Sequence, residues 1–174
     1  MGSVTTNSDK LYESLHNYQI FSGTNPGPFD CFLCIRGLKT LSLRVERQNQ
    51  NGLTVAQFLS KHKNVEKVMY PGLETDPFYE KAKKQFKGCG GVVSFILKGG
   101  VEKCKQFLQK VKLFHCAVSL GSVESLAEHP ATMTHQCVPP EIRKKIGIED
   151  GLIRLSVGIE NIEDLLADLA QALE

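Results

Sequence analysis

The sequence lacks the marks of a membrane protein or a nucleic-acid-binding protein. No apolar run in its 174 residues approaches the roughly 20 residues of a membrane span, and residues 1–10 are too polar for a signal peptide. The 21 basic residues nearly balance the 19 acidic ones, and the net charge of +2 gives no reason to expect nucleic acid or a membrane as partner. We therefore expect a cytoplasmic protein with one sizeable core.

The motifs of a self-contained active site are also missing. There is no glycine-rich phosphate loop, no nucleophile elbow and no cluster of metal ligands, so no metal is expected. His129 and His135 flank one loop, and a hydrogen-bonded structural role is the more common outcome for each. Without a bound cofactor, the chain offers no catalytic constellation of its own.

The six cysteines would suit three disulfides only in a secreted protein. Because no signal peptide is evident, free thiols are the better interpretation. Cys31 and Cys34 have the spacing of a redox or zinc half-site, but no second pair with ligand spacing follows. We expect both to lie on a helix, where cysteine behaves as a small hydrophobic residue.

The first part of the chain favours helices. Ser8 or Asp9 can cap a helix that ends near residue 19, and a Pro- and Gly-rich loop at 23–28 precedes a short helix at 30–37. A long amphipathic helix is predicted over 38–62, with its middle weakened by the poor helix formers of 48–52.

From residue 64 the pattern alternates between strands and helices. Strands are expected at 65–70, 92–97, 114–118 and 152–158, and helices at 76–86, 101–111, a short one from 139, and 162–173 after the cap Asn161; residues 119–134 are expected to be irregular. This order, with little βαβ regularity, predicts an α+β fold: an antiparallel or mixed sheet with helices on one face.

The last predicted strand carries one arginine in an apolar run. Alternation directs Ile153, Leu155 and Val157 to one face, and Arg154 to the other, away from the main core. A guanidinium fork matches a carboxylate, so Arg154 is a candidate anchor for an acid-bearing substrate. On this stretch alone, a structural ion pair or a snorkelling side chain is the more common alternative.

Several segments together resemble the pyridoxal-phosphate-dependent enzymes of cysteine and methionine metabolism, which include cystathionine γ-lyase, cystathionine β-lyase, cystathionine γ-synthase and methionine γ-lyase. The resemblance covers essentially the whole chain in order. The matching segments are Pro28-Phe-Asp-Cys-Phe-Leu-Cys-Ile-Arg-Gly-Leu-Lys-Thr-Leu41, Val68-Met-Tyr-Pro-Gly-Leu73, Ser119-Leu-Gly121, Glu124-Ser-Leu126, His129-Pro-Ala-Thr-Met-Thr-His135, Gly147-Ile148 and Leu152-Ile-Arg-Leu-Ser-Val-Gly158.

The resemblance implies the small carboxy-terminal domain of fold-type I enzymes, with a mostly antiparallel sheet at 64–174. Residues 1–63 would be a remnant of the large domain and a long bridging helix. In the family, a Schiff-base lysine holds the cofactor, and the segments around it lie just before the point that matches residue 1. We therefore expect no catalytic residue in this chain, and no turnover by it alone.

The same resemblance assigns substrate-binding roles to three residues. Arg154 would bind the substrate α-carboxylate, Ser119 would lie beside the catalytic lysine and that carboxylate, and Thr134 would support the same end of the pocket through its hydroxyl. The alternatives are a turn residue for Ser119 and a local backbone hydrogen bond for Thr134.

Val118 bears on which sulfur amino acid is the substrate. Animal cystathionine γ-lyases usually carry a glutamate immediately before this serine, whereas valine suits an apolar substrate side chain. Overall similarity still points to a cystathionine γ-lyase-like carbon-sulfur lyase, with methionine γ-lyase or cystathionine β-lyase activity as alternatives. Family members are homo-oligomers, so a noncatalytic domain that pairs with a full-length subunit is the other alternative.

Overall fold

The computed structural model describes residues 2–174; Met1, the first residue of the part predicted at 1–63, lies outside them. The chain divides into two compact units, residues 1–42 and 43–174. The first unit holds α1 (Asp9–Ser22), α2 (Pro28–Leu38) and the first two residues of α3 (Leu41–Ser60). Within the described residues, no helix is long and apolar enough to cross a membrane.

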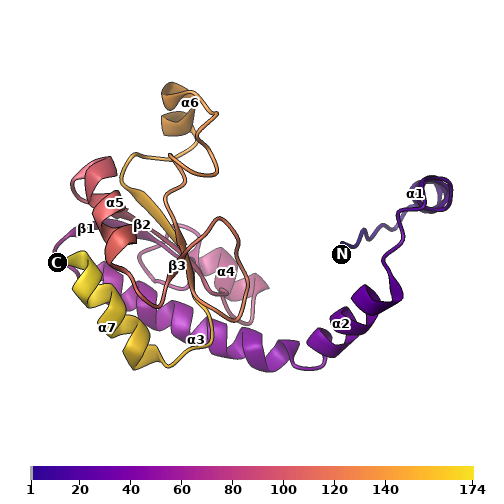
Figure 1. The fold of residues 1–174 in the computed structure, drawn as a ribbon, viewed down its shortest axis with the longest axis horizontal. Helices are drawn as coiled ribbons and strands as arrows, with labels where there is room; N and C mark the ends of the chain where they lie inside the picture. The colour runs from indigo at the N-terminus through magenta and orange to yellow at the C-terminus, as the bar shows by residue number, and fades with distance from the viewer. Residues whose placement is uncertain (1) are drawn as a thin grey trace. The chain divides into compact units, whose positions relative to one another are not determined.

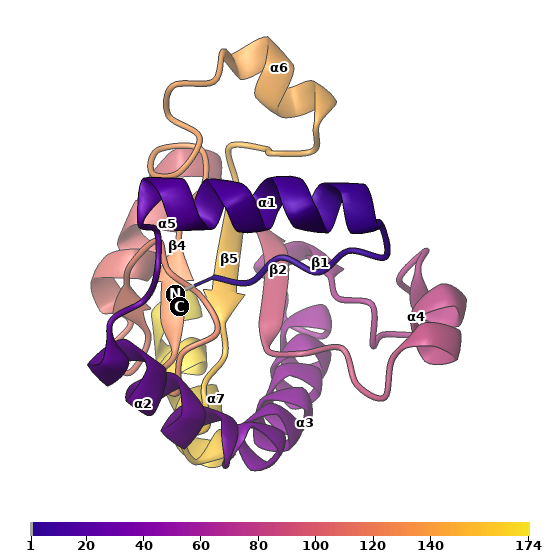
Figure 2. The ribbon, with the colours of Figure 1, turned by 90° about the vertical axis from the view of Figure 1, so that its right-hand side faces the viewer.

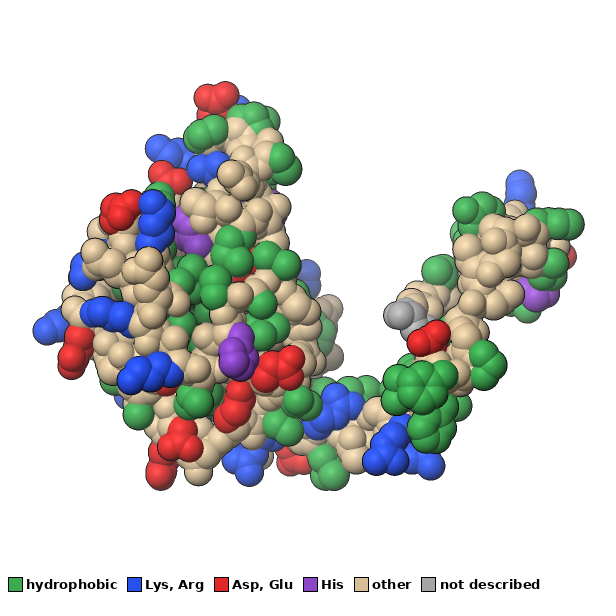
Figure 3. Space-filling view, viewed as in Figure 1, with side chains coloured by type: hydrophobic (Ala, Val, Ile, Leu, Met, Phe, Trp, Pro, Cys, Tyr) green, Lys and Arg blue, Asp and Glu red, His purple; other side chains and the backbone are tan. Residues whose placement is uncertain are grey.

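Local signals explain the two short helices of the first unit. The Ser8 hydroxyl accepts a hydrogen bond from Leu11 N at 3.4 Å, and Gly23 ends α1 with a left-handed φ of 66°. Pro28 opens α2, where Asp30 accepts from Gly27 N. Neither helix has a buried residue, and Figure 3 shows hydrophobic side chains over their surface. Phe21, for example, is 87% exposed. These helices therefore have no hydrophobic core of their own.

The second unit is built on a five-stranded sheet with the order β1-β2-β5-β4-β3 (Figure 1). Three of its four strand pairings are antiparallel, and β3 pairs with β4 in parallel. The elements after α3 are β1 (Val65–Met69), α4 (Tyr79–Gln85), β2 (Val92–Leu97), α5 (Gly100–Lys110), β3 (His115–Cys116), β4 (Leu126–Glu128), α6 (Pro140–Lys145), β5 (Leu152–Ser156) and α7 (Ile162–Leu173). The predicted α+β composition is confirmed.

One face of this sheet carries the hydrophobic core. Helices α3, α5 and α7 supply the side chains that pack on it, and Figure 2 shows α3 and α7 behind the central strands β2 and β5. Phe95 of β2 meets Phe107 of α5 edge to face, with ring centroids 5.6 Å apart. The alternate residues of the strands point to the opposite face, where Arg154 lies.

The long helix predicted over residues 38–62 is present as α3, and its middle is complete although residues 48–52 are poor helix formers. In α3 this stretch is helical, and Gln48, Asn51 and Gly52 are buried. Asn51 Nδ2 donates to the carbonyls of Gly158 and Glu160, at 3.1 and 3.0 Å, while Gly52 allows Gly90 O to approach. Tertiary hydrogen bonds thus outweigh the low helix propensity of Asn and Gly.

The expected irregular region at 119–134 contains a strand that the sequence pattern did not reveal. β4 is only three residues long, but all three are buried, and it pairs with β5. By contrast, the strand expected at 114–118 is reduced to the two residues of β3. Because β4 has no β-branched residue and no room for alternation, its pairing with β5 defines it rather than its own sequence.

Candidate functional site

Arg154 lies in the middle of β5, between two strands. Its antiparallel partners are Ser94 of β2 and Glu128 of β4. The neighbours Ile153 and Leu155 are fully buried in the core, so the predicted alternation along this strand is confirmed. The guanidinium therefore projects from the sheet face opposite helices α3, α5 and α7.

Three acceptors hold the Arg154 guanidinium. Nη1 lies 2.8 Å from Glu128 Oε1, and Nη2 donates to the carbonyls of Val118 and Ser119 at 2.8 and 2.9 Å. The Arg154 side chain keeps 19% of its surface exposed. The arginine is thus paired with a buried carboxylate while one part of it remains accessible to a ligand.

Glu128 is the site residue that sequence reasoning missed. Its side chain is only 1% exposed, and Oε1 accepts from the Thr134 hydroxyl at 3.3 Å as well as from Arg154. Oε2 and Arg154 Nε are both buried without a hydrogen-bond partner in the described chain. The sequence held no separate signal for Glu128, because β4, the strand that carries it, was expected to be irregular.

The structure brings the predicted substrate-binding residues to one place by different routes. Arg154 and Thr134 meet at Glu128, whereas Ser119 reaches Arg154 through its backbone carbonyl. The hydroxyl of exposed Ser119 makes no hydrogen bond within residues 2–174. Val118 is 54% exposed beside it. The cluster therefore offers a partly exposed guanidinium and the Ser119 hydroxyl as donors to a carboxylate, while the Thr134 hydroxyl already donates to Glu128.

Side chains from distant segments fix the loop that follows Ser119. Gly121 N donates to Ser156 Oγ at 2.8 Å, and Gln48 Nε2 donates to Ser122 O at the same distance. Beyond them, the Glu160 carboxylate accepts from the backbone N–H and the hydroxyl of Ser125. Because β5, α3 and the segment before α7 all hold this loop, its geometry is set by tertiary structure.

The two histidines beside the site have structural contacts. His129 is buried, with Nδ1 2.8 Å from Thr132 Oγ1 and Nε2 2.9 Å from Asp150 O, which confirms the predicted hydrogen-bonded role. His135 Nδ1 lies 2.9 Å from Thr134 Oγ1. Neither histidine contacts Arg154.

All six cysteines are free thiols. Cys31 and Cys34 lie on α2, as predicted. In the part of the chain that the structure describes, no three metal-binding side chains lie close enough together to hold a metal ion.

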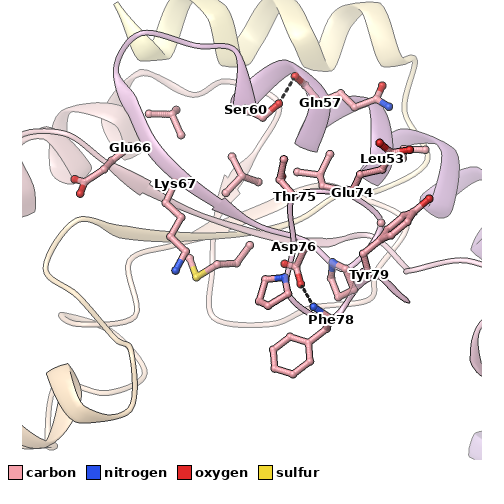
Figure 4. A pocket seen from close by; sticks show the side chains of 17 residues that line it. Leu53, Gln57, Ser60, Glu66, Lys67, Glu74, Thr75, Asp76, Phe78 and Tyr79 are labelled. Carbon is pink, nitrogen blue, oxygen red and sulfur yellow. Dashed lines mark hydrogen bonds between the residues drawn. The ribbon is translucent and has the colours of Figure 1, made fainter. Parts of the chain in front are cut away.

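A groove of about 1060 Å³ lies elsewhere, between α3, β1 and the loop before α4 (Figure 4). Asp76 lines it, but its carboxylate already accepts from the backbone N–H groups of Tyr70 and Phe78. Tyr70 itself does not line the groove: its phenol donates to Gly90 O at 2.8 Å, and burial raises its pKa well above the ordinary value. Because the Asp76 carboxylate serves the fold, this groove carries no assignment.

The described residues do not fit the cofactor that the resemblance implies, although they fit a substrate carboxylate. A Schiff-base lysine must be enclosed with the cofactor that it holds, yet every lysine in residues 2–174 is exposed. Two guanidinium groups of the second unit are already paired: Arg154 with Glu128, and Arg143 with Asp150 at 3.3 Å. No catalytic step through pyridoxal phosphate follows from these residues alone.

Comparison with known proteins bears directly on this site. Residues 1–174 match the family described as Cys/Met metabolism PLP-dependent enzyme. The whole chain is 53% identical to the cystathionine gamma-lyases of Dictyostelium discoideum and Rattus norvegicus, of which it covers 45% and 44%. It is 54% identical, over 153 residues, to the L-methionine gamma-lyase of Fusobacterium nucleatum, with 88% of the chain and 39% of that protein covered.

The chain spans less than half the length of each of these relatives. Within the stretch that it does span, the match is continuous and includes the strand of Arg154, the loop of Val118 and Ser119, and Thr134. The chain belongs to the family of pyridoxal-phosphate-dependent enzymes of cysteine and methionine metabolism.

Proposed function

We propose that this chain is the substrate-carboxylate-binding, carboxy-terminal portion of a pyridoxal-phosphate-dependent carbon-sulfur lyase. Arg154 binds the α-carboxylate of a sulfur amino acid, and the hydroxyls of Ser119 and Thr134 support the same end of the pocket. The observation that carries this proposal is the placement of a single, partly exposed guanidinium beside these two residues. In such a site the cofactor supplies the electron sink, while these residues orient the amino acid.

The substrate class follows from the two ends of the site. Arg154 selects a carboxylate, and Val118, exposed next to it, offers the distal part of the substrate an apolar surface. Similarity to the cystathionine gamma-lyases favours β- or γ-elimination from cystathionine. Val118 favours a methionine γ-lyase activity instead, because valine cannot pair with a distal ammonium group and suits an apolar side chain. Cystathionine β-lyase activity is the remaining alternative.

Binding of the carboxylate can be tested on the chain as it stands. We expect L-methionine and L-cystathionine to shift the backbone amide resonances of Val118, Ser119 and β5 in NMR titrations, with weak but saturable binding. Arg154→Lys keeps the charge but loses the bidentate fork, so it should abolish saturation. Arg143→Lys, at an arginine paired with Asp150 outside the cluster, is the matched control and should leave the titration unchanged. No saturation with the unsubstituted chain would refute the proposal.

We further propose that the 174-residue chain alone does not turn over substrate, because its lysines are all exposed. The test is incubation with pyridoxal phosphate, followed by absorption spectroscopy, borohydride reduction and mass analysis of peptides, together with an assay for thiol release. We expect no single lysine to be labelled and no thiol to be released. Labelling at one lysine with accompanying turnover would refute this part of the proposal.

We also propose that residues 1–63 are a remnant of the large domain with a bridging helix. Residues 64–174 would then form the carboxy-terminal domain of a fold-type I enzyme.

A noncatalytic role in association with a full-length subunit is the second candidate function. The uncovered apolar side chains of α1 and α2, such as Phe21 and Phe29, favour it. Sedimentation of the chain alone and mixed with a full-length lyase tests it, and a cytoplasmic location stays a prediction.

A further inference from the structure

We propose that Glu128 is a positioning residue for the Arg154 guanidinium, and that carboxylate recognition depends on it. This inference rests on the proposed function of Arg154. Glu128 and Arg154 face each other directly across the β4–β5 pairing, on the sheet face opposite the core. The 2.8 Å contact between Oε1 and Nη1 therefore joins two side chains whose backbones are already fixed by the sheet.

The contact does not have the form of an ion pair that only stabilises the fold. Arg–carboxylate pairs frequently form two parallel hydrogen bonds, one to each oxygen. Here one oxygen of Glu128 takes part, while Oε2 and Arg154 Nε are buried without a partner in residues 2–174. Unsatisfied buried groups are costly, and they are concentrated where function requires a particular orientation.

The contacts of Arg154 differ in how readily a ligand can replace them. Of the five N–H groups of a guanidinium, one donates to Glu128 and two donate to the carbonyls of Val118 and Ser119. Both forks of a guanidinium include Nη2, so a carboxylate that binds through two hydrogen bonds must displace at least one of these carbonyls. The carbonyls belong to an exposed loop, whereas Glu128 is buried. Glu128 is thus the contact that stays in place when the substrate arrives.

Thr134, another predicted substrate-binding residue, contacts the same Glu128 carboxylate. Its hydroxyl donates to Glu128 Oε1, the oxygen that Arg154 contacts. Thr134 and Arg154 consequently share one fixed reference point, although they come from different segments. A shift of the Glu128 carboxylate would move both side chains away from the substrate.

The test uses Glu128→Gln, because charge and position predict opposite results for it. Glutamine removes a negative charge beside Arg154, which by Coulomb attraction alone would tighten the binding of a carboxylate. If Glu128 acts by position, the neutral amide oxygen holds Nη1 through a weaker hydrogen bond, the guanidinium turns more freely, and the binding of L-methionine weakens about tenfold, as expected for coupled residues in one hydrogen-bond network. The affinity is measured by NMR titration of the chain.

A second variant and a control complete the design. Glu128→Asp keeps the charge but withdraws the carboxylate by one methylene, so positioning predicts weaker binding here too. The separate Nη–H signals of a held Arg154 should merge in both variants as rotation of the guanidinium becomes faster. Glu141→Gln removes the same charge from an exposed residue of α6 and should change neither signal nor affinity.

The possible outcomes separate this inference from the proposed function. Equal or tighter binding by Glu128→Gln, with saturable binding by the unsubstituted chain, overturns the positioning role and leaves Arg154 as the anchor. If the unsubstituted chain shows no saturable binding, Arg154 is not a carboxylate-binding residue and Glu128 has no positioning role. The Arg154–Glu128 ion pair would then serve only the structure. Weaker binding by both variants with merged Nη–H signals supports the proposal, and a β5 amide spectrum unchanged from the parent shows that each variant is folded.

Discussion

Asp168 holds the segment that leads into β3, and its replacement by asparagine should destabilise the second unit measurably. The side chain is 6% exposed on α7. Its oxygens accept from Lys112 N at 2.9 and 3.0 Å, from Leu113 N at 2.8 Å and from Phe114 N at 3.3 Å. Three consecutive backbone N–H groups thus converge on one carboxylate, an arrangement that secures the chain just before the Val118 loop.

The size of the effect follows from what asparagine cannot accept. An Asn oxygen at the place of Oδ2 can still accept from all three N–H groups, but its N–H₂ then faces Lys112 N and the Gln171 amide, which both donate to Oδ1. A hydrogen bond to a charged group contributes about 1.5–3 kcal/mol and a neutral one about 0.5–1.5 kcal/mol, so each of the three N–H groups loses about 1 kcal/mol. We therefore expect Asp168→Asn to lower the free energy of unfolding by about 3 kcal/mol.

Urea unfolding at neutral pH measures this quantity, with the slope of the transition as a check that one cooperative unit unfolds. Asp164→Asn is the matched control, because it removes the same charge from the exposed first turn of the same helix. It should cost only about 0.5 kcal/mol through the helix dipole. A loss below about 1 kcal/mol for Asp168→Asn, or equal losses for both variants, would refute the reasoning.

Two further predictions concern packing and pH. Alanine normally stabilises a helix relative to glycine, but a Cβ at Gly52 would lie 2.5 Å from Gly90 O. We therefore expect Gly52→Ala to lower the free energy of unfolding, measured in urea, by about 1–3 kcal/mol. A gain in stability would contradict the packing described for α3. Burial raises the pKa of Cys104 from its ordinary value of 9.0 to about 12, so below pH 9 both states are protonated, and above it only the unfolded state loses the proton. The thiol should therefore lower the free energy of unfolding by about 1.4 kcal/mol per pH unit between pH 9 and 12. In Cys104→Ala, the free energy of unfolding should fall less steeply with pH by this amount. Identical pH dependence in variant and parent would contradict the prediction.

Elements with complete local signals were predictable from the sequence. α7 begins after Asn161, whose side chain accepts from Glu163 N at 2.8 Å, and its predicted apolar face includes the buried residues Leu165 and Leu169. β2 has the predicted bounds, since a β-branched and aromatic run is bracketed by glycines. In both cases the sequence neighbours of a residue decide its structure, so no distant contact is needed.

The missed features depend on distant partners instead. β4 is defined by its pairing with β5, and the helical middle of α3 by the hydrogen bonds of Asn51 to the chain just before α7. The same holds for Glu128, which became a site residue only when Arg154 was seen opposite it. Local propensity does not encode such contacts, which arise when segments separated by many residues are brought together.

The loop that carries Val118 and Ser119 shows why an irregular segment can still form a defined site. It has almost no secondary structure, yet Arg154 holds its start, Ser156 its middle and Glu160 its end. Two of these side chains lie on β5 and the third follows it closely, so one stretch of chain sets both the proposed anchor and the loop beside it. A carboxylate that displaces the Val118 or Ser119 carbonyl from Arg154 would therefore act on the residue proposed to read the substrate side chain. In the proposed site, carboxylate binding and side-chain selection would therefore be coupled through the Arg154 guanidinium.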